Sequence, residues 1–299
     1  MSASMKMTRA QVPMDEMILA PGSTCQGCGA AMAARLTFKV LGPNLIRHGI
    51  PCCPDHVSKH PRAGSVFEAG GASLTGTSRA LKALGRTDVK AVAFYGDGGT
   101  YDIGFQALSA AAERNENILV ITKDNEAYMN TGGQRSGGTP KYAETTTNPV
   151  GPNSRGKGEP KKNIPMIFAA HYVPYIATAS VAFPEDLMQK VKYAKDIEGF
   201  RIILIQAPCP VGWRFDPAKT IELARAGVQA GVWPLYEIEH GTSFKLNYKP
   251  KELKPVSEYL KPQSRFRHMT EAEVNEVQGN VTSNWARLLK ADELKTVVL

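Results

Sequence analysis

Runs of apolar residues alternate with amphipathic segments along this 299-residue chain, and the alternation predicts its elements. Strands are predicted where short runs are apolar, at residues 89–95, 117–122, 175–181 and 200–207. Helices are predicted where apolar or small residues follow helical spacing, at residues 30–41, 69–84, 102–114 and 184–197. Fully apolar strands need cover on both faces of a sheet, and strand–helix–strand succession makes neighbouring strands parallel. The pattern therefore predicts an α/β fold: a parallel sheet with helices on both faces.

The remaining segments divide the chain into three predicted parts. Residues 1–20 have little periodicity and are predicted to form an N-terminal extension, followed by a main domain at residues 21–240. Residues 241–299 are predicted to be a C-terminal tail that packs on the domain or on a partner subunit, since short helices and Pro-rich turns follow Pro210. Residues 131–165 are rich in Gly, Thr, Pro and Lys, and so long a loop is typical of a functional segment.

The chain carries 36 Lys and Arg against 28 Asp and Glu, which gives a formal net charge of +8. Nucleic-acid binding is one interpretation of this excess. The basic residues are scattered, however, and their densest group, at residues 157–162, lies in a Gly- and Pro-rich stretch where a solvated face is the simpler account. An acidic partner subunit or an acidic electron carrier fits the charge better than nucleic acid.

Composition also bears on the compartment. Apolar runs are far shorter than the roughly 20 residues that cross a bilayer, and the N-terminal residues do not resemble a signal peptide, so we expect a cytoplasmic protein without membrane contact. Four of the five cysteines lie in the first 53 residues, and two of them form Cys25-Gln26-Gly27-Cys28. In a reducing cytoplasm this spacing indicates metal binding or redox chemistry rather than disulfides.

The most informative motif follows the strand at residues 89–95. Gly96-Asp97-Gly98-Gly99 stands at its carboxyl end, where glycines let the backbone approach phosphate and a following helix offers free N–H groups. The next predicted strand ends at Asp124-Asn125, and 125 − 97 = 28 residues separate Asp97 from Asn125. Because a helix between parallel strands returns the chain to the same edge, the two side chains should lie side by side.

Two hard oxygen ligands beside diphosphate oxygens suit Mg²⁺, which coordinates six oxygens at about 2.0–2.1 Å. The simpler alternative is a turn aspartate followed by an asparagine that hydrogen-bonds its own backbone. The strand context and the spacing favour the metal.

These residues resemble the signature of thiamine diphosphate enzymes. The run Gly-Asp-Gly-Gly-Thr-Tyr-Asp-Ile-Gly-Phe at 96–105 and the run Tyr-Met-Asn-Thr-Gly-Gly-Gln at 128–134 resemble one branch, the β subunits of the pyruvate (2-oxoacid):ferredoxin oxidoreductase family. The likeness continues through Ala-Pro-Cys-Pro-Val-Gly-Trp-Arg-Phe-Asp at 207–216 and Trp-Pro-Leu-Tyr-Glu at 233–237, and it covers roughly residues 20–240. The main domain is thereby identified as a thiamine diphosphate-binding domain.

The resemblance implies a set of cofactor ligands. Asp97 and Asn125 would bind Mg²⁺ by their side chains and Ala127 by its carbonyl oxygen. The glycines of the motif and Thr131 would lie against the cofactor: Gly96, Gly98 and Gly99 at the diphosphate, with Thr131 further along the pocket. Asn130 matches a catalytic position near the thiazolium and the substrate, where an amide could orient the 2-oxoacid carbonyl or stabilise a developing alkoxide. A loop-capping role is the plainer alternative for Asn130.

The cysteines admit two metal centres, because zinc and an iron–sulfur cluster both accept the spacing of Cys25 and Cys28. The resemblance implies a 4Fe–4S cluster with Cys53 and Cys209 as the other ligands. Such a cluster could accept electrons after decarboxylation, whereas zinc has no redox chemistry.

The chain departs from the family pattern at the third ligand. The pattern usually has Gly-Cys and a Thr-rich run where this chain has Cys-Cys-Pro-Asp-His at 52–56. The spacing favours Cys53 over Cys52 as the ligand. His56 could line the pocket or be a structural histidine.

Two further positions invite a role. Arg135 could pair with a substrate carboxylate, contact the diphosphate or form a salt bridge with another subunit. Trp213 and Arg214, just after Cys209, are expected to shield the cluster from solvent.

The implied reaction converts a 2-oxoacid, such as pyruvate, coenzyme A and oxidised ferredoxin into acyl-CoA, CO₂ and reduced ferredoxin. No residue matches the glutamate that thiamine catalysis needs at the aminopyrimidine, and no further Cys-X-X-Cys repeats are present. The resemblance therefore implies a heteromer with an α-type pyrimidine-binding subunit, a γ-type subunit and a ferredoxin-like cluster subunit. The alternatives are a relative acting on an aryl 2-oxoacid or on oxalate, a non-redox thiamine decarboxylase, and a zinc-stabilised nucleic-acid binder.

Overall fold

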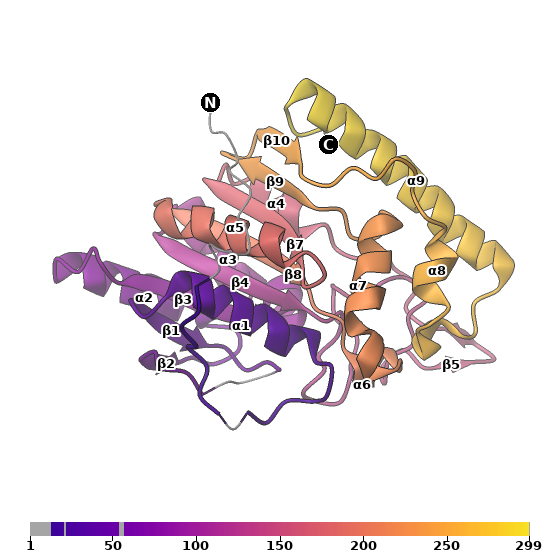
Figure 1. The fold of residues 1–299 in the computed structure, drawn as a ribbon, viewed down its shortest axis with the longest axis horizontal. Helices are drawn as coiled ribbons and strands as arrows, with labels where there is room; N and C mark the ends of the chain where they lie inside the picture. The colour runs from indigo at the N-terminus through magenta and orange to yellow at the C-terminus, as the bar shows by residue number, and fades with distance from the viewer. Residues whose placement is uncertain (1–12, 21, 54–56, 299) are drawn as a thin grey trace.

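The computed structural model describes residues 13–20, 22–53 and 57–298 of the chain. In this part of the chain, eight strands form one sheet in the order β10-β9-β7-β8-β4-β3-β1-β2 (Figure 1). The strands from β7 to β2 run parallel, whereas β9 pairs antiparallel with β7 and β10 antiparallel with β9. Their bounds are β1 (Leu45–Gly49), β2 (Arg62–Gly64), β3 (Lys90–Gly96), β4 (Ile118–Asp124), β7 (Tyr175–Ser180), β8 (Phe200–Gln206), β9 (Tyr236–Glu239) and β10 (Ser243–Leu246). The predicted α/β fold is confirmed.

Helices cover both faces of this sheet (Figure 1). One apolar core joins the sheet to side chains of α2, α3, α4 and α9, among them Leu74, Leu108 and Phe168. The core on the other face is formed with α1 and α5 and includes Phe38 and Leu187. The helix bounds are α1 (Gly29–Leu41), α2 (Gly70–Ala83), α3 (Phe105–Glu113), α4 (Ile164–Ala169), α5 (Pro184–Asp196), α6 (Pro210–Trp213), α7 (Thr220–Gln229), α8 (Val256–Leu260) and α9 (Glu271–Leu294).

The segment after β3 differs from the single helix predicted at residues 102–114. A π-helix at Gly98–Ile103 follows the strand directly, and α3 begins only at Phe105. The two meet at Gly104, where an added Cβ would lie 2.4 Å from the carbonyl oxygen of Gly99. The wider turn is therefore possible because Gly104 has no side chain, and it begins immediately after Asp97.

The C-terminal region holds more regular structure than the short helices predicted there. β10 continues the sheet past residue 240, and α9 is 24 residues long. Its start is fixed by a capping box in which Thr270 and Glu273 each bond the other's backbone N–H. Asp292 near its end accepts a hydrogen bond from the backbone of Leu246 in β10 at 2.8 Å. The tail is thus attached to the edge of the sheet (Figure 1).

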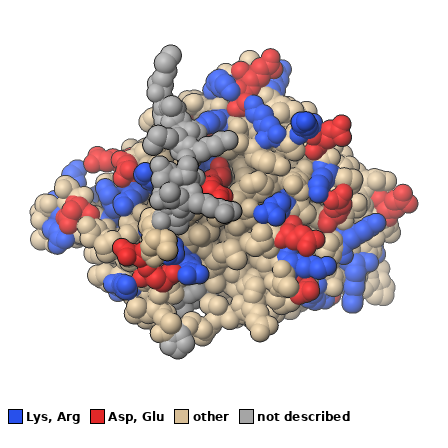
Figure 2. All heavy atoms as spheres, viewed as in Figure 1, with Lys and Arg blue, Asp and Glu red and all other residues tan. Residues whose placement is uncertain are grey.

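The long loop at residues 131–165 lies between the sheet edge and this tail. It contains the short antiparallel pair β5 (Val150–Gly151) and β6 (Ser154–Arg155). Arg155 forms an ion pair with Glu273 at 2.6 Å, and Lys141 one with Glu276 at 2.5 Å. Helix α9 therefore fastens the loop from outside. On the face seen in Figure 2, Lys and Arg side chains are interspersed with Asp and Glu.

Candidate functional site

The predicted meeting of Asp97 and Asn125 occurs at the carboxyl edge of the sheet. β3 and β4 are parallel neighbours, with Gly96 opposite Lys123, so the residues that follow each strand emerge together. With its amide nitrogen turned inward, Asn125 donates to Asp97 Oδ1 and to the Ala127 carbonyl oxygen, each at 2.9 Å. The three predicted metal ligands therefore converge on one point.

This convergence fits a magnesium ion. Turning the Asn125 amide over would place its oxygen 2.9 Å from the two other oxygens. Oxygens on adjacent corners of an Mg²⁺ octahedron are separated by about 2.9 Å, because each lies about 2.1 Å from the ion. The donor set thus has the chemistry of such a site, and the two spacings from Asn125 match those of neighbouring ligands on one octahedron.

The carboxylate of Asp97 is fully buried and receives a hydrogen bond from the Ser136 hydroxyl. Burial, and after it the nearby carboxylate of Asp124, hold the pKa of Asp97 well above its ordinary value. A divalent cation beside Asp97 would favour its charged form.

The packing around the motif requires glycine at residues 98 and 99. A Cβ on Gly98 would lie 2.3 Å from the ring of Tyr128, and one on Gly99 would lie 2.9 Å from the ring of Tyr95. Tyr128 also donates its hydroxyl to the carbonyl oxygen of Gly98 at 3.1 Å. The aromatic rings therefore pack directly against the first turn of the π-helix, where only glycine fits.

A small cavity of about 50 Å³ opens over this motif. Pockets for drug-sized ligands usually enclose about 300–1,000 Å³, so this chain encloses only part of a cofactor site. Asn130 and Thr131 line the cavity and are exposed. The lining residues are Pro51, Cys52, Cys53, Phe67, Gly96, Gly98, Asn125, Ala127, Tyr128, Met129, Asn130 and Thr131.

Two predicted cluster ligands lie at the ends of helices. Cys28 caps α1 and accepts a hydrogen bond from Ala31 N at 3.4 Å, and Cys209 caps α6 and accepts one from Gly212 N at 3.3 Å. Gly27 adopts a φ of 65°, which glycine tolerates and which allows a tight turn between Cys25 and Cys28. The amide of Gly29 donates to Pro208 O at 3.1 Å, which holds the two cysteine segments together.

Cys53 belongs to the same group of thiols. Burial, then the proximity of Cys209, Cys52 and Cys28, raise the pKa of Cys53 to about 11. Burial likewise raises the pKa of the Cys28 and Cys209 thiols, and neighbouring cysteines add to the rise in each case. Cys28, Cys53 and Cys209 therefore lie in one neighbourhood of thiols.

Cys52 faces the thiamine motif instead. Its thiol donates to the carbonyl oxygen of Phe94 at 3.6 Å, and its Cβ lies 3.2 Å from a Cβ placed on Gly96. His56 lies outside the described residues.

Within residues 13–20, 22–53 and 57–298, no three His, Cys, Asp or Glu side chains are close enough to hold a single metal ion. A zinc ion requires ligand atoms about 2.0–2.3 Å from one centre. A four-iron cluster spaces its thiolates more widely, because iron and sulfide atoms lie between them.

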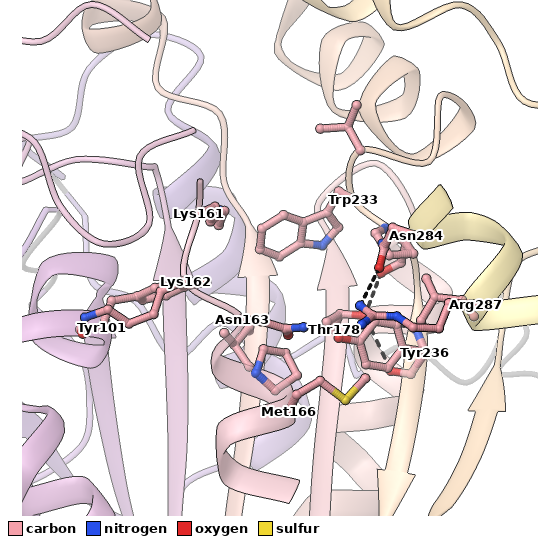
Figure 3. A pocket seen from close by; sticks show the side chains of 15 residues that line it. Tyr101, Lys161, Lys162, Asn163, Met166, Thr178, Trp233, Tyr236, Asn284 and Arg287 are labelled. Atoms are coloured by element: carbon pink, nitrogen blue, oxygen red, sulfur yellow. Dashed lines mark hydrogen bonds between the residues drawn. The ribbon is translucent and has the colours of Figure 1, made fainter. Parts of the chain in front are cut away.

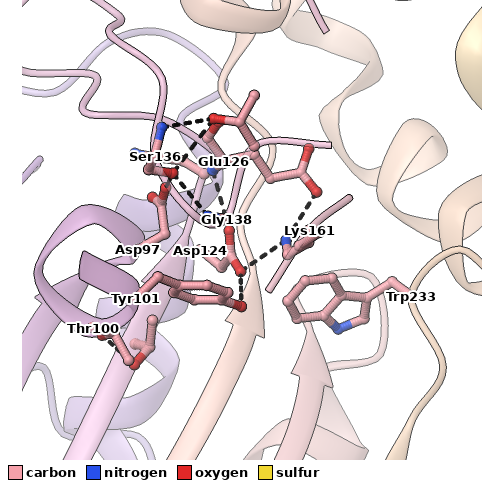
Figure 4. A network of polar contacts seen from close by, with 12 residues as sticks. Asp97, Thr100, Tyr101, Asp124, Glu126, Ser136, Gly138, Lys161 and Trp233 are labelled. Carbon is pink, nitrogen blue, oxygen red and sulfur yellow. Dashed lines mark hydrogen bonds and ion pairs between the residues drawn. The ribbon is translucent and has the colours of Figure 1, made fainter. Parts of the chain in front are cut away.

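A buried network of charges lies behind the proposed metal ligands (Figure 4). Asp124 accepts from the Tyr101 hydroxyl at 2.5 Å and forms an ion pair with Lys161 at 2.9 Å. Glu126 is paired with Lys161 at 3.1 Å and with Arg265 at 2.5 Å. These two cations keep the pKa of Glu126 below its ordinary value against the opposing effect of its burial. No motif in the sequence identifies this network.

A second cavity of about 250 Å³ lies on the other side of Lys161 (Figure 3). Trp233 forms one wall and stacks against the Lys161 ammonium at 4.5 Å, while Arg287 of α9 bonds Asn284 at 2.8 Å. Its lining in the described chain includes Lys161, Lys162 and Arg287 and no carboxylate.

Two other predicted residues have definite partners. Arg135 forms an ion pair with Glu159 of the same chain at 3.6 Å between exposed side chains, so its contacts with substrate, diphosphate or another subunit stay predictions. Trp213 is fully buried, and its indole nitrogen donates to the carbonyl oxygen of Asn125 at 2.8 Å. It therefore supports the metal-ligand turn, a role that the sequence did not indicate.

Comparison with known proteins agrees with this geometry. The family described as "Thiamine pyrophosphate enzyme, C-terminal TPP binding domain" matches residues 60–205. Pyruvate synthase subunit PorB of Methanothermobacter thermautotrophicus is 51% identical over 278 residues, covering 90% of this chain and 96% of that protein. Ketoisovalerate oxidoreductase subunit VorB of Pyrococcus abyssi is 43% identical over 302 residues, covering 96% of each.

Among solved structures, the fold resembles a 2-oxoglutarate:ferredoxin oxidoreductase from Magnetococcus marinus. The TM-score is 0.58 at 22% identity, over 73% of this chain and 81% of that one. In the described residues no helix is both long and apolar enough to cross a membrane.

The fold and the site define the class as a thiamine diphosphate-binding α/β domain. Within that class, the chain belongs to the β subunits of the pyruvate and 2-oxoacid:ferredoxin oxidoreductases, the family of PorB and VorB. It is one subunit of a multi-subunit oxidoreductase.

Proposed function

We propose that the chain binds thiamine diphosphate through Mg²⁺ held by Asp97, Asn125 and the Ala127 carbonyl, and a 4Fe–4S cluster through Cys25, Cys28, Cys53 and Cys209. The observation that carries the proposal is the convergence of the three oxygens at 2.9 Å, beside a cavity that Cys53 also lines. The proposed metal ligands and the predicted cluster ligand Cys53 are thus neighbours of the same pocket.

The chemistry divides between cofactor and protein. When bound, thiamine diphosphate supplies the electron sink for decarboxylation and the cluster a one-electron acceptor. The chain itself holds the diphosphate against Gly96, Gly98 and Gly99 and places Thr131 at the rim. The Asn130 amide, also on the cavity wall, orients the substrate carbonyl.

The overall reaction joins an acyl group to coenzyme A. A 2-oxoacid and coenzyme A give acyl-CoA, CO₂ and a proton, and two electrons pass through the cluster to ferredoxin. The small enclosed volume supports completion of the site by an α-type pyrimidine-binding subunit, and γ-type and ferredoxin-like subunits complete the complex. The thiolates of such a cluster require a reducing compartment, which supports a cytoplasmic location.

Pyruvate is the first substrate to test, because the relatives at about half identity are pyruvate synthase subunits. The second is 2-ketoisovalerate, because the VorB relatives match over nearly the whole chain. Aryl 2-oxoacids and oxalate belong in the same panel, since the Cys-Cys-Pro-Asp-His segment departs from the family pattern.

The test uses the complete complex, purified without oxygen. We expect iron and sulfide, Mg²⁺ and thiamine diphosphate in the protein, and reduction of ferredoxin that depends on a 2-oxoacid and coenzyme A. Asp97→Asn should lose Mg²⁺ and thiamine diphosphate but keep iron, whereas Cys209→Ser should lose iron. A wild-type complex that contains zinc and no iron, or no thiamine diphosphate, would refute the proposal.

A further inference from the structure

The turn after β4 has an unusual backbone. It must bring the Asn125 side chain and the Ala127 carbonyl to one point, and between them Glu126 has a φ of 66°. A residue with a side chain rarely adopts this left-handed conformation unless its surroundings impose it. The turn therefore depends on contacts from elsewhere in the chain.

Glu126 is held in this conformation on every side. Its backbone N–H donates to Asp124 Oδ1 at 3.1 Å, and its carbonyl oxygen accepts from the Thr139 hydroxyl at 2.7 Å. Its buried carboxylate pairs with Lys161 at 3.1 Å (Figure 4). It also pairs with Arg265 at 2.5 Å. Arg265 comes from the C-terminal tail, 139 residues further along the chain.

Arg265 reaches the turn by a second route. Its guanidinium lies 4.1 Å from the ring centroid of Trp213, and the indole nitrogen of Trp213 donates to Asn125 O at 2.8 Å. Gln263 fixes the guanidinium by accepting from its Nε at 2.9 Å. The C-terminal tail thus supports both Asn125 and Glu126 through one buried cation.

We propose that Arg265 is a positioning residue that locks the metal-ligand turn, so that the C-terminal tail of the chain sets its affinity for Mg²⁺ and thiamine diphosphate. This inference rests on the proposed function. A planar guanidinium presents several N–H donors in one fixed plane, so Arg265 can pair with Glu126, bond Gln263 and lie flat over the Trp213 indole at the same time.

The chain offers a matched control at Arg201. Its side chain is equally buried, but it lies near the start of β8 and bonds Ala194 O at 3.0 Å, with Gly199 O and Asn117 as further partners. Loss of either arginine should destabilise the fold, because buried partners remain unpaired. Only loss of Arg265 should change the turn.

The experiment measures thiamine diphosphate binding to the cofactor-stripped complex at several Mg²⁺ concentrations, using calorimetry. We expect Arg265→Met to raise the Kd for thiamine diphosphate about tenfold or more, as removal of one partner from a buried pair does. Its kcat at saturating cofactor should stay within about threefold of the wild type, because Arg265 touches no substrate. Arg201→Met should lower the melting temperature and leave the Kd within about twofold.

The variant Arg265→Lys should raise the Kd less than Arg265→Met. If Arg265→Met does not assemble into the complex, the measurement on Arg265→Lys replaces it. Glu126→Gln combined with Arg265→Met should raise the Kd by less than the product of the two single-variant factors, since the two residues share one ion pair. An unchanged Kd in both Arg265 variants, or an equal rise in Arg201→Met, overturns this inference. A wild-type complex that binds no thiamine diphosphate overturns the proposed function instead.

Discussion

The indole nitrogen of Trp213 donates a hydrogen bond to the carbonyl oxygen of Asn125 at 2.8 Å. Trp213 ends α6, the helix that Cys209 caps, while Asn125 supplies a proposed Mg²⁺ ligand. One hydrogen bond therefore joins the segment that carries the proposed cluster ligand Cys209 to the turn that carries the proposed Mg²⁺ ligand Asn125. A displacement of either segment is transmitted directly to the other.

Replacing Trp213 with Phe tests this link. The variant keeps an aromatic ring but leaves a buried carbonyl oxygen without its donor, at a cost of about 1–3 kcal/mol. We expect a lower free energy of unfolding and a several-fold weaker binding of thiamine diphosphate, with iron retained. Trp233→Phe is the control, because the indole nitrogen of Trp233 makes an equivalent bond to Ala179 O at 2.8 Å rather than to the turn, and phenylalanine keeps an aromatic ring beside Lys161. Equal loss of cofactor affinity in both variants would contradict the prediction.

The adjacent thiols Cys52 and Cys53 should respond differently to serine substitution. The nearby thiols of Cys209 and Cys28 help to raise the pKa of Cys53. The Cys52 thiol instead donates to Phe94 O. We expect Cys53→Ser to lose most of the iron and sulfide, and the visible absorbance that dithionite bleaches, while Cys52→Ser keeps them. Chemical analysis of iron and sulfide in the two complexes, purified side by side without oxygen, gives the answer. The reverse result would assign the ligand to Cys52.

Gly29 should be essential for the cluster although it is not a ligand. A Cβ at this position would lie 2.7 Å from Pro208 N and 2.8 Å from the Ala207 carbonyl carbon, and these backbone atoms cannot move independently of Cys209. We expect Gly29→Ala to separate the segments of Cys28 and Cys209 and to lower the iron content severalfold. Gly76→Ala, at an open position in α2, is the control and should stabilise the helix by about 0.5–1 kcal/mol. Full iron content in Gly29→Ala would contradict this prediction, because the cluster would then tolerate the separation of the two segments.

Local sequence carries the parts of the site that depend on strand ends. Asp97 and Asn125 could be placed together because each follows a fully apolar strand and a helix connects the two. The turn at Gly27 was predictable for a similar reason, since a two-residue spacing between cysteines needs a glycine or its equivalent. In these cases short motifs at the ends of predicted strands and helices carry both the reactive side chains and the information that places them.

The remaining parts depend on contacts between distant segments. Nothing near Glu126 indicates its pairing with Arg265, and nothing near Lys161 distinguishes it from the solvated lysines around it. Strands β9 and β10 were missed because four-residue strands have little periodicity, while the length of α9 could have been found from the capping residues Thr270 and Glu273.

Lys157 should make the stability of the chain depend on pH above neutrality. Its ammonium is buried and donates to Thr139 O at 2.6 Å and Pro160 O at 3.2 Å. Burial, and after it the charge of Arg135, lower the pKa of Lys157 from 10.5 to about 8. Between these values the unfolded chain keeps the proton that the folded chain has lost, so the free energy of unfolding should rise with pH.

The measurement compares the wild type with Lys157→Met in denaturant titrations from about pH 7.5 to 10.5. The lowered pKa of Lys157 limits the pH-dependent change in the free energy of unfolding to about 3 kcal/mol. We expect a change on the order of 1–2 kcal/mol, because solvent and Glu159 offset part of the burial penalty. A neutral amine retains two N–H donors, so both carbonyl contacts survive deprotonation. The stability difference, wild type minus variant, should therefore increase through this window, whereas Lys82→Met, at an exposed position, should show no such trend. A difference that stays constant or decreases with pH would show that Lys157 remains charged in the folded chain.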